Sequence, residues 1–167
     1  AVRPAPARTL AVLADPVFSD DDPRIPRAVS TPGRPSPAAN PAAVSVRDLD
    51  RASADVGGFG PENRLAALPF SRREADAILR HVPPAASIKP VDFDASYATA
   101  TSPDLAQYRF VHFATHGLLN STHPELSGLV LSLVDRNGRS QQGFLRAHVV
   151  YNLRLPADLV VLSGCRT

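Results

Sequence analysis

His116 and Cys165 are the two side chains of this sequence best suited to nucleophilic chemistry. His116 ends the apolar run in FATHG, and Cys165, the single cysteine, follows the apolar run in VLSGC. A thiol becomes a useful nucleophile when a base or a cation lies nearby, and the leaving amine of a cleaved amide needs a proton. An imidazole beside a thiol meets both needs. The pair therefore predicts attack on a carbonyl, with Cys165 as nucleophile and His116 as acid and base.

Gly117, directly after the histidine, adds a backbone group to this pair. A glycine lets its backbone N–H approach a substrate with no side chain in the way. Together with the N–H of Cys165, the Gly117 N–H would form an oxyanion hole for a tetrahedral intermediate. Gly117 also has a second interpretation, a positive φ at a turn, and the two roles are compatible.

The cysteine and the histidine each have a purely structural interpretation as well. A free cysteine is most often a buried core residue, and a histidine at a strand end is often held by a hydrogen bond. The position of Cys165 after Ser163 and Gly164, together with FATHG, favours the catalytic interpretation. Arg166 either stabilises a Cys165 thiolate or points to solvent, and both readings stay open.

No metal or cofactor site is predicted. His112 and His116 are four residues apart, a spacing that brings two ligands together on a helix but sets them about 13 Å apart on a strand. His112 is therefore interpreted as a strand histidine, and His123, in an Asn-Ser-Thr-His-Pro loop, as an exposed one. A zinc site needs about four ligands, and no such set can be assembled.

Three apolar runs are expected to form the strands that position these residues: Thr9–Ala14, Tyr108–Thr115 and Ala157–Ser163. Short apolar runs of this kind are typical of buried parallel strands. In open parallel sheets, ligand sites lie beyond the carboxyl ends of the strands. If the second and third runs are neighbours in the sheet, His116 and Cys165 emerge side by side at that edge.

The remaining segments predict an α/β fold with a mainly parallel sheet flanked by helices. Ser71–Val82 has helical spacing, with Ser71 as N-cap and Glu74 completing a capping box. Asn137-Gly138 favours a hairpin turn. The other expected elements are a short strand at 86–91, a helix broken near Pro103 at 97–107, hairpin strands at 129–134 and 143–145, and a short helix at 147–153.

A segment rich in Pro, Ser and Ala interrupts the chain after the first strand. Such a composition cannot bury enough apolar surface to offset its ordering entropy, so a disordered insert is expected. The sequence is accordingly divided into a first-strand region at 1–18, the insert at 19–64, and the main part of the domain at 65–167.

The composition excludes several classes of protein. Hydrophobic residues make up 44% of the 167, and the net charge is +2 with no long basic run, so a globular domain without a nucleic-acid partner is expected. No apolar stretch approaches the roughly 18 residues of a membrane span. A single cysteine excludes a disulfide scaffold and favours a cytoplasmic setting. The Ala, Arg and Pro richness is typical of a bacterial, GC-rich genome.

Several blocks in order resemble the CHAT domain family, caspase-like domains often attached to tetratricopeptide repeats and distantly related to caspases and separases. The blocks are YRFVHFATHGLLN, PELSGLVLS, the Gly143–Leu145 step and LPADLVVLSGCRT, with LAVLADPVF and LPFSRREADAIL upstream. The spacing agrees, since the two reactive residues are 49 apart (165 − 116) and the caspase histidine lies about 50 residues before its cysteine. The caspase signature Gln-Ala-Cys-x-Gly is only partly kept.

The resemblance implies a caspase-hemoglobinase fold and a cysteine endopeptidase domain acting on protein or peptide substrates through His116 and Cys165, without a cofactor. It also implies regulation by attached repeats or by a partner complex. In relatives that favour basic side chains an acid lies near Asp15, which makes Asp15 a candidate substrate-binding residue, although a turn at Asp15-Pro16 is the favoured interpretation.

Two other functions are weighed against the peptidase. A caspase-like module that serves only in protein interaction would keep the fold without the chemistry. A flavodoxin-like small-molecule binder ranks last, because Asp15-Pro16-Val17-Phe18 is not a Gly-rich phosphate loop. Domains of the family continue past the cysteine, whereas this sequence has two further residues and no Met, so we expect a fragment with an incomplete sheet, inactive alone.

Overall fold

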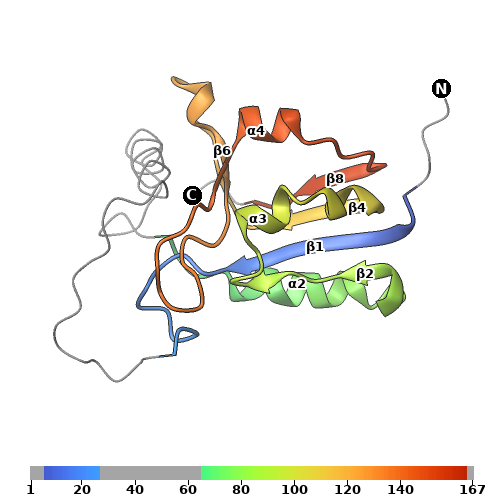
Figure 1. Cartoon of the computed structure of the whole chain (residues 1–167), viewed down its shortest axis with the longest axis horizontal. Coiled ribbons are helices and arrows are strands. Elements are labelled where there is room, and N and C mark those ends of the chain that lie inside the picture. Colours follow the sequence, from blue (N-terminus) through green and yellow to red (C-terminus); the bar gives the residue numbers. More distant parts are fainter. Residues whose placement is uncertain (1–5, 27–64, 165–167) are drawn as a thin grey trace.

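The computed structural model describes residues 6–26 and 65–164. A mainly parallel sheet forms its centre, and helices lie on both sides of that sheet (Figure 1). The elements in chain order are β1 (Arg8–Pro16), α2 (Pro69–Leu79), η1 (Pro84–Ala86), β2 (Ser87–Ile88), β3 (Val91–Asp92), α3 (Tyr97–Ala100), η2 (Pro103–Gln107), β4 (Tyr108–Ala114), β5 (His116–Leu118), η3 (Pro124–Leu126), β6 (Gly128–Val130), β7 (Phe144–Arg146), α4 (Ala147–Asn152) and β8 (Leu159–Leu162). The α/β fold expected from the sequence is confirmed.

The central sheet has the order β2-β1-β4-β8, with β3 also paired to β1. All of these pairings are parallel. The three longer strands coincide with the three apolar runs of the sequence, while the short strand expected at 86–91 is split into β2 and β3. The strand that leads to His116 therefore lies between the first strand and the strand that leads to Cys165.

The helix α2 covers one face of the sheet. Because side chains alternate across a strand, Leu10, Val12 and Ala14 of β1 all point to this face. They pack against Ala75 and Ile78 of α2, and Ala75 is fully buried. Full burial of an aliphatic side chain stabilises a fold by about 1.5–3 kcal/mol. This contact therefore fixes α2 against the strands that end at the candidate site.

The opposite face is covered by α3, η2 and α4. Ala11 and Leu13 of β1 point to this side together with Val111 and Phe113 of β4. They form the largest described core cluster, into which the buried side chain of Leu129 from β6 also packs. Figure 1 shows α3 and α4 on this side of the sheet, away from α2.

A second, antiparallel sheet continues directly from the first. Its order is β5-β6-β7, and β5 begins two residues after β4 ends. The hairpin expected around Asn137-Gly138 is present: β6 pairs with β7, and Gly138 has a φ of +73°, which glycine adopts without steric cost. The chain turns from one sheet into the other at Thr115, so His116 stands at the junction of the two.

Two local expectations are corrected. Ser71 is not the N-cap of the helix, because α2 begins at Pro69 with Leu68 as N-cap and no side-chain capping bond. The Ser71 hydroxyl instead donates to the carbonyl oxygen of Leu68 and accepts from the N–H of Asp15, at 2.8 and 2.9 Å. The second correction concerns β8. Its sequence is typical of a buried strand, but its four side chains are all exposed in the described structure.

The segment after β1 is described only as far as Pro26. Its residues 19–26 form turns, and Arg24 is anchored to the carbonyl oxygens of Asp15 and Pro16. The rest of the predicted insert, residues 27–64, lies outside the described residues. Among the helices that are described, none has the length and the apolar character needed to cross a membrane.

Candidate active site

The ends of β4 and β8 lie side by side in the central sheet. The ladder pairs Phe110 with Leu159 and Phe113 with Leu162, and in each pair the residue numbers differ by 49 (159 − 110 and 162 − 113). The N–H of Ser163 then donates to the carbonyl oxygen of Phe113 at 2.9 Å. The two strands predicted to carry the reactive residues are therefore parallel neighbours that end at the same edge.

Gly164 lies tightly against the backbone that flanks His116. A Cβ built on Gly164 would be 3.0 Å from the carbonyl oxygen of Thr115 and 3.2 Å from the amide nitrogen of Gly117. These distances are shorter than ordinary van der Waals contacts, so glycine permits the approach. Cys165 itself lies outside the described residues, and the described chain ends at its covalent neighbour Gly164.

His116 is the first residue of β5 and is only 3% exposed. Its Nε2 lies 2.8 Å from the carbonyl oxygen of Ala66, and its ring centroid is 5.1 Å from that of Phe18. Burial lowers the pKa of His116 below its ordinary value of 6.5, and the hydrogen bond to Ala66 opposes part of this shift. The imidazole is therefore neutral at neutral pH.

The partner of Nε2 determines the tautomer of this neutral ring. A carbonyl oxygen only accepts hydrogen bonds, so the Nε2 of His116 carries the proton and donates a hydrogen bond to the carbonyl oxygen of Ala66. In a neutral imidazole the lone pair is then on Nδ1. This nitrogen can take a proton from an acid and return it later, which is the behaviour required of a general base.

Gly117 is part of β5, where it pairs with Leu129 of β6. Its backbone does not have a positive φ: among the described glycines only Gly138 has one. The turn interpretation of Gly117 is therefore wrong. The Gly117 amide nitrogen lies next to Gly164, so one of the two predicted oxyanion donors is beside the segment that leads to the other, Cys165.

Glu74 of α2 connects to both strands of the site, a role that its place in the expected capping box did not predict. Its Oε2 accepts a hydrogen bond from the Ser163 hydroxyl at 3.2 Å, and its Oε1 lies 3.3 Å from Nε2 of the buried His112. A separation of 89 positions along the chain conceals this contact in the sequence. Glu74 ties the end of β8 to the helix that covers β4.

Asp15 lies at the end of β1 and is almost fully buried, but its carboxylate has two cationic partners. The closest oxygen–nitrogen distances are 2.8 Å to Arg72 and 3.2 Å to Arg24. Both guanidinium groups also bind Asp92, which belongs to β3. Asp15 and Asp92 are the two described residues other than glycine with positive φ, a conformation that aspartate tolerates better than most residues.

His112 lies in β4 on the face covered by α2, as a strand histidine should. In the described ranges, no three histidine, cysteine or acidic side chains come together in a way that would hold a metal ion. His123 is exposed and lies 3.4 Å from Glu125.

The family model of the CHAT domain matches residues 2–167. The chain belongs to the CHAT domain family. CHAT domains are caspase-like domains of the peptidase type, and the parallel sheet flanked by helices agrees with that fold. Comparison with curated proteins and comparison with solved structures both give no match. Family membership thus rests on the sequence as a whole, and the chemistry on the residues around His116.

Proposed function

We propose that this CHAT domain is a cysteine endopeptidase domain in which Cys165 is the nucleophile and His116 the acid–base residue. The observation that supports the proposal most directly is the register of β4 and β8. Paired residues of these strands differ by 49, and so do His116 and Cys165. The tight contact of Gly164 with the residues on either side of His116 points to the same juxtaposition.

The proposed reaction proceeds through a thioester. The sulfur of Cys165 bonds to the scissile carbonyl carbon while the thiol proton passes to Nδ1 of His116. The amides of Gly117 and Cys165 donate hydrogen bonds to the oxyanion. The C–N bond then breaks, and His116 gives the proton to the leaving amine. Water attacks the thioester, which releases the carboxylic acid and restores the thiol, so no cofactor is consumed.

The substrates in this proposal are proteins or peptides, and the setting is the cytoplasm, where a free thiol stays reduced. Regulation by attached tetratricopeptide repeats or by a partner complex belongs to the same proposal. Asp15 is a weaker candidate for binding a basic side chain, because two guanidinium groups already neutralise its carboxylate.

Covalent labelling of the complete natural protein tests the proposal. A peptide with a carbon electrophile at its C-terminus should modify Cys165, which is located by mass spectrometry of the digested protein. Cys165→Ala should abolish this modification, and His116→Ala should slow it by about a hundredfold or more. His123→Ala, which alters an exposed histidine, serves as the matched control and should label normally.

Two results would refute the proposal. If Cys165 in the folded protein reacts no faster than a free thiol in a short peptide, the dyad is not formed. If labelling is rapid in the wild type and unchanged in Cys165→Ala, another residue is the nucleophile, and this domain serves in interaction.

A further inference from the structure

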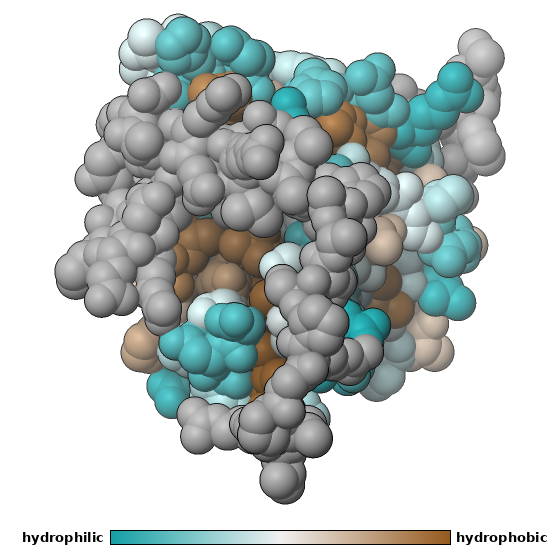
Figure 2. Space-filling model, turned by 60° about the vertical axis from the view of Figure 1, so that its left-hand side comes forward, coloured by the Kyte–Doolittle hydropathy of each residue, from teal (hydrophilic) through white to brown (hydrophobic). Residues whose placement is uncertain are grey.

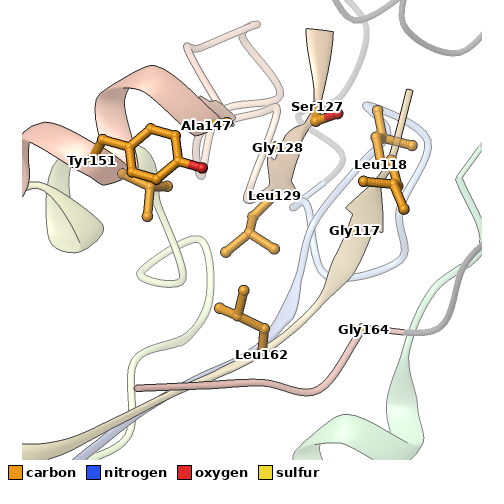
Figure 3. A pocket seen from close by; sticks show the side chains of 11 residues that line it. Gly117, Leu118, Ser127, Gly128, Leu129, Ala147, Tyr151, Leu162 and Gly164 are labelled. Carbon is orange, nitrogen blue, oxygen red and sulfur yellow. The ribbon is translucent and has the colours of Figure 1, made fainter. Parts of the chain in front are cut away.

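An apolar pocket of about 470 Å³ opens beside Gly117 and Gly164. Figure 3 shows the side chains of Leu129 and Leu162 facing each other across it, with the ring of Tyr151 extending from α4. The described lining of the pocket comes mainly from β5, β6, α4 and β8 and includes Ala147, Val150 and Gly164. The pocket therefore lies between the candidate catalytic edge of the central sheet, the second sheet and α4.

Among the described lining residues, the Tyr151 phenol is the one ionisable group, and the Ser127 hydroxyl is already hydrogen-bonded. The Ser127 hydroxyl accepts a hydrogen bond from the Asn120 N–H at 3.0 Å and lies 3.4 Å from the Asn120 carbonyl oxygen. A carboxylate or guanidinium group placed here would lose hydration without finding an opposite charge among the described residues, which is unfavourable. An aliphatic or aromatic group has no such cost.

Large apolar groups border the pocket and remain open to solvent in the described structure. Tyr151 is 87% exposed, Leu119 is 63% exposed and Leu162 is 56% exposed. Covering apolar area stabilises a complex. Figure 2 shows hydrophobic residues on the face toward which the strands end. A ligand with an apolar side chain gains from burying these groups.

We propose, on the basis of the peptidase function above, that this pocket selects an apolar side chain of the substrate next to the scissile bond. Gly164 lines the pocket and is the covalent neighbour of Cys165, so the pocket begins within one residue of the nucleophile. Successive residues of an extended peptide are about 3.3–3.6 Å apart, which keeps the side chain beside the attacked carbonyl within reach of it.

The proposal predicts a preference for Leu, Met or Phe over Arg, Asp or Gly at this position. The volume lies in the range of about 300–1,000 Å³ that is typical of ligand sites, which is room for a large side chain and part of its backbone. Each methylene that fits such a pocket changes the rate by roughly tenfold or more. A probe with leucine should therefore react at least tenfold faster than one with glycine.

The experiment compares electrophilic peptide probes on the complete natural protein. All probes carry the same reactive group and differ only in the residue beside it: Leu, Met, Phe, Arg, Asp or Gly. Chloroacetamide, which is too small to need the pocket, reports the reactivity of the Cys165 thiol separately. Second-order rate constants for modification of Cys165 are measured by mass spectrometry.

Ala147→Phe is designed to fill the pocket from the first residue of α4. It should slow the leucine probe at least tenfold and leave the chloroacetamide rate unchanged. His148→Phe places the same ring on the neighbouring, exposed position of α4 outside the lining, and it should behave as the wild type. Val150→Ala enlarges the pocket by a smaller change and should shift the preference from leucine toward phenylalanine.

The outcomes separate the pocket from the peptidase function. Fast modification with a preference for arginine or aspartate, or a leucine rate that neither Ala147→Phe nor Val150→Ala alters, overturns the pocket assignment and leaves the peptidase function standing. If another part of the natural protein fills the pocket, the probe preference will not depend on Ala147 or Val150, and this result also overturns the pocket assignment alone. Absence of modification by all probes overturns both.

Discussion

Burial determines the protonation state of His116 in the absence of substrate. Its Nε2 is hydrogen-bonded to Ala66 and its ring contacts that of Phe18, so groups that do not react help to fix its orientation. In a neutral ring with the proton on Nε2 the lone pair is on Nδ1, the atom that would take the thiol proton in the proposed chemistry, whereas a charged imidazolium has no such lone pair. Desolvation therefore favours the form of His116 that the proposed chemistry needs.

The same shift in pKa makes the stability of the fold depend on pH. Between the lowered pKa of His116 and its ordinary value of 6.5, the unfolded chain binds a proton that the folded chain does not. The free energy of unfolding should therefore decrease as the pH falls below 6.5, and His116 should have no such effect above that value. Urea unfolding at about pH 7.5 and about pH 5.5 measures the difference.

His116→Phe supplies the control, since phenylalanine keeps a ring beside Phe18 but cannot titrate. Its loss of stability on acidification should be smaller than that of the wild type. Carboxylates contribute equally to both proteins. An equal loss in the two would show that His116 is not responsible for this pH dependence.

Gly164 and Gly117 allow a matched comparison of two glycines at the site. A methyl group on Gly164 meets backbone atoms at 3.0 and 3.2 Å, whereas one on Gly117 meets only the Cδ2 atom of Leu129 at 3.8 Å. Gly164→Ala should therefore reduce the free energy of unfolding by about 1 kcal/mol or more, as overpacking does, and Gly117→Ala should have little effect. Urea unfolding of both variants checks this, and equal effects would contradict the close approach of β8 to β5.

At the scale of elements, α2 supports the strand ends that form the candidate site. Its apolar side packs on β1, and its polar residues reach the ends of the strands: Ser71 and Arg72 bind Asp15, and Glu74 binds Ser163. The end of β8 would otherwise be held by β4 and by the Gly164 contact alone in the described part of the chain. The helix thereby couples the position of one strand end to the others.

Removal of the Glu74 contact should loosen the end of β8. Glu74→Ala in the complete protein should slow modification of Cys165 by peptide probes roughly tenfold, because a small misplacement of reacting groups is costly. Glu74→Gln keeps an oxygen that can accept from Ser163, so it should restore most of the rate. If Glu74 has a purely structural role, Glu74→Ala should lower the free energy of unfolding, and Glu74→Gln should not restore the rate of Cys165 modification.

Asp76→Ala is the matched control for that experiment. Asp76 is an acid of the same helix whose partner is Lys89 on the surface, away from the strand ends. Its loss should leave the rate of modification unchanged. If Glu74→Ala and Asp76→Ala behave alike, Glu74 does not position the strand.

Three charged side chains around Asp15 come from three segments of the chain. Arg24 comes from the turns after β1, Arg72 from α2 and Asp92 from β3. Because Asp15 is nearly buried, removing one cation leaves its carboxylate poorly compensated. Arg72→Met, which keeps the apolar stem, should lower the free energy of unfolding by about 1–2 kcal/mol, allowing for partial exposure of the arginine. Arg72→Met in an Asp15→Asn background should cost clearly less, and equal costs would show that the pair is uncoupled.

At the scale of the whole molecule, the sequence predicted the parallel sheet and its three longer strands because apolar runs are local features. The adjacency of β4 and β8 was a condition of the hypothesis, and the structure shows it. The sequence did not predict the side-chain contacts made between distant segments. Arg24 lies in a stretch whose composition indicates disorder, yet ion pairs with Asp15 and Asp92 anchor it. Ser71 has the residue type of an N-cap, but its hydroxyl is engaged by Leu68 and by β1.

The exposure of β8 has a consequence for the molecule as a whole. In the described structure β8 pairs only with β4, and its side chains are between 36% and 56% exposed. An open strand edge with apolar side chains is a template for pairing with another chain. The isolated 167-residue chain should therefore self-associate, with a sedimentation coefficient that rises with protein concentration.

A lysine in the middle of that strand should suppress this association, since charge on an edge strand opposes pairing. Val160→Lys is suitable because Val160 is already 41% exposed, so the fold can accept the longer side chain. His148→Lys adds the same residue to exposed α4 and should still associate. A wild-type chain that stays monomeric at all concentrations, or a Val160→Lys chain that associates as strongly as the wild type, would show that the β8 edge is not the surface through which chains meet.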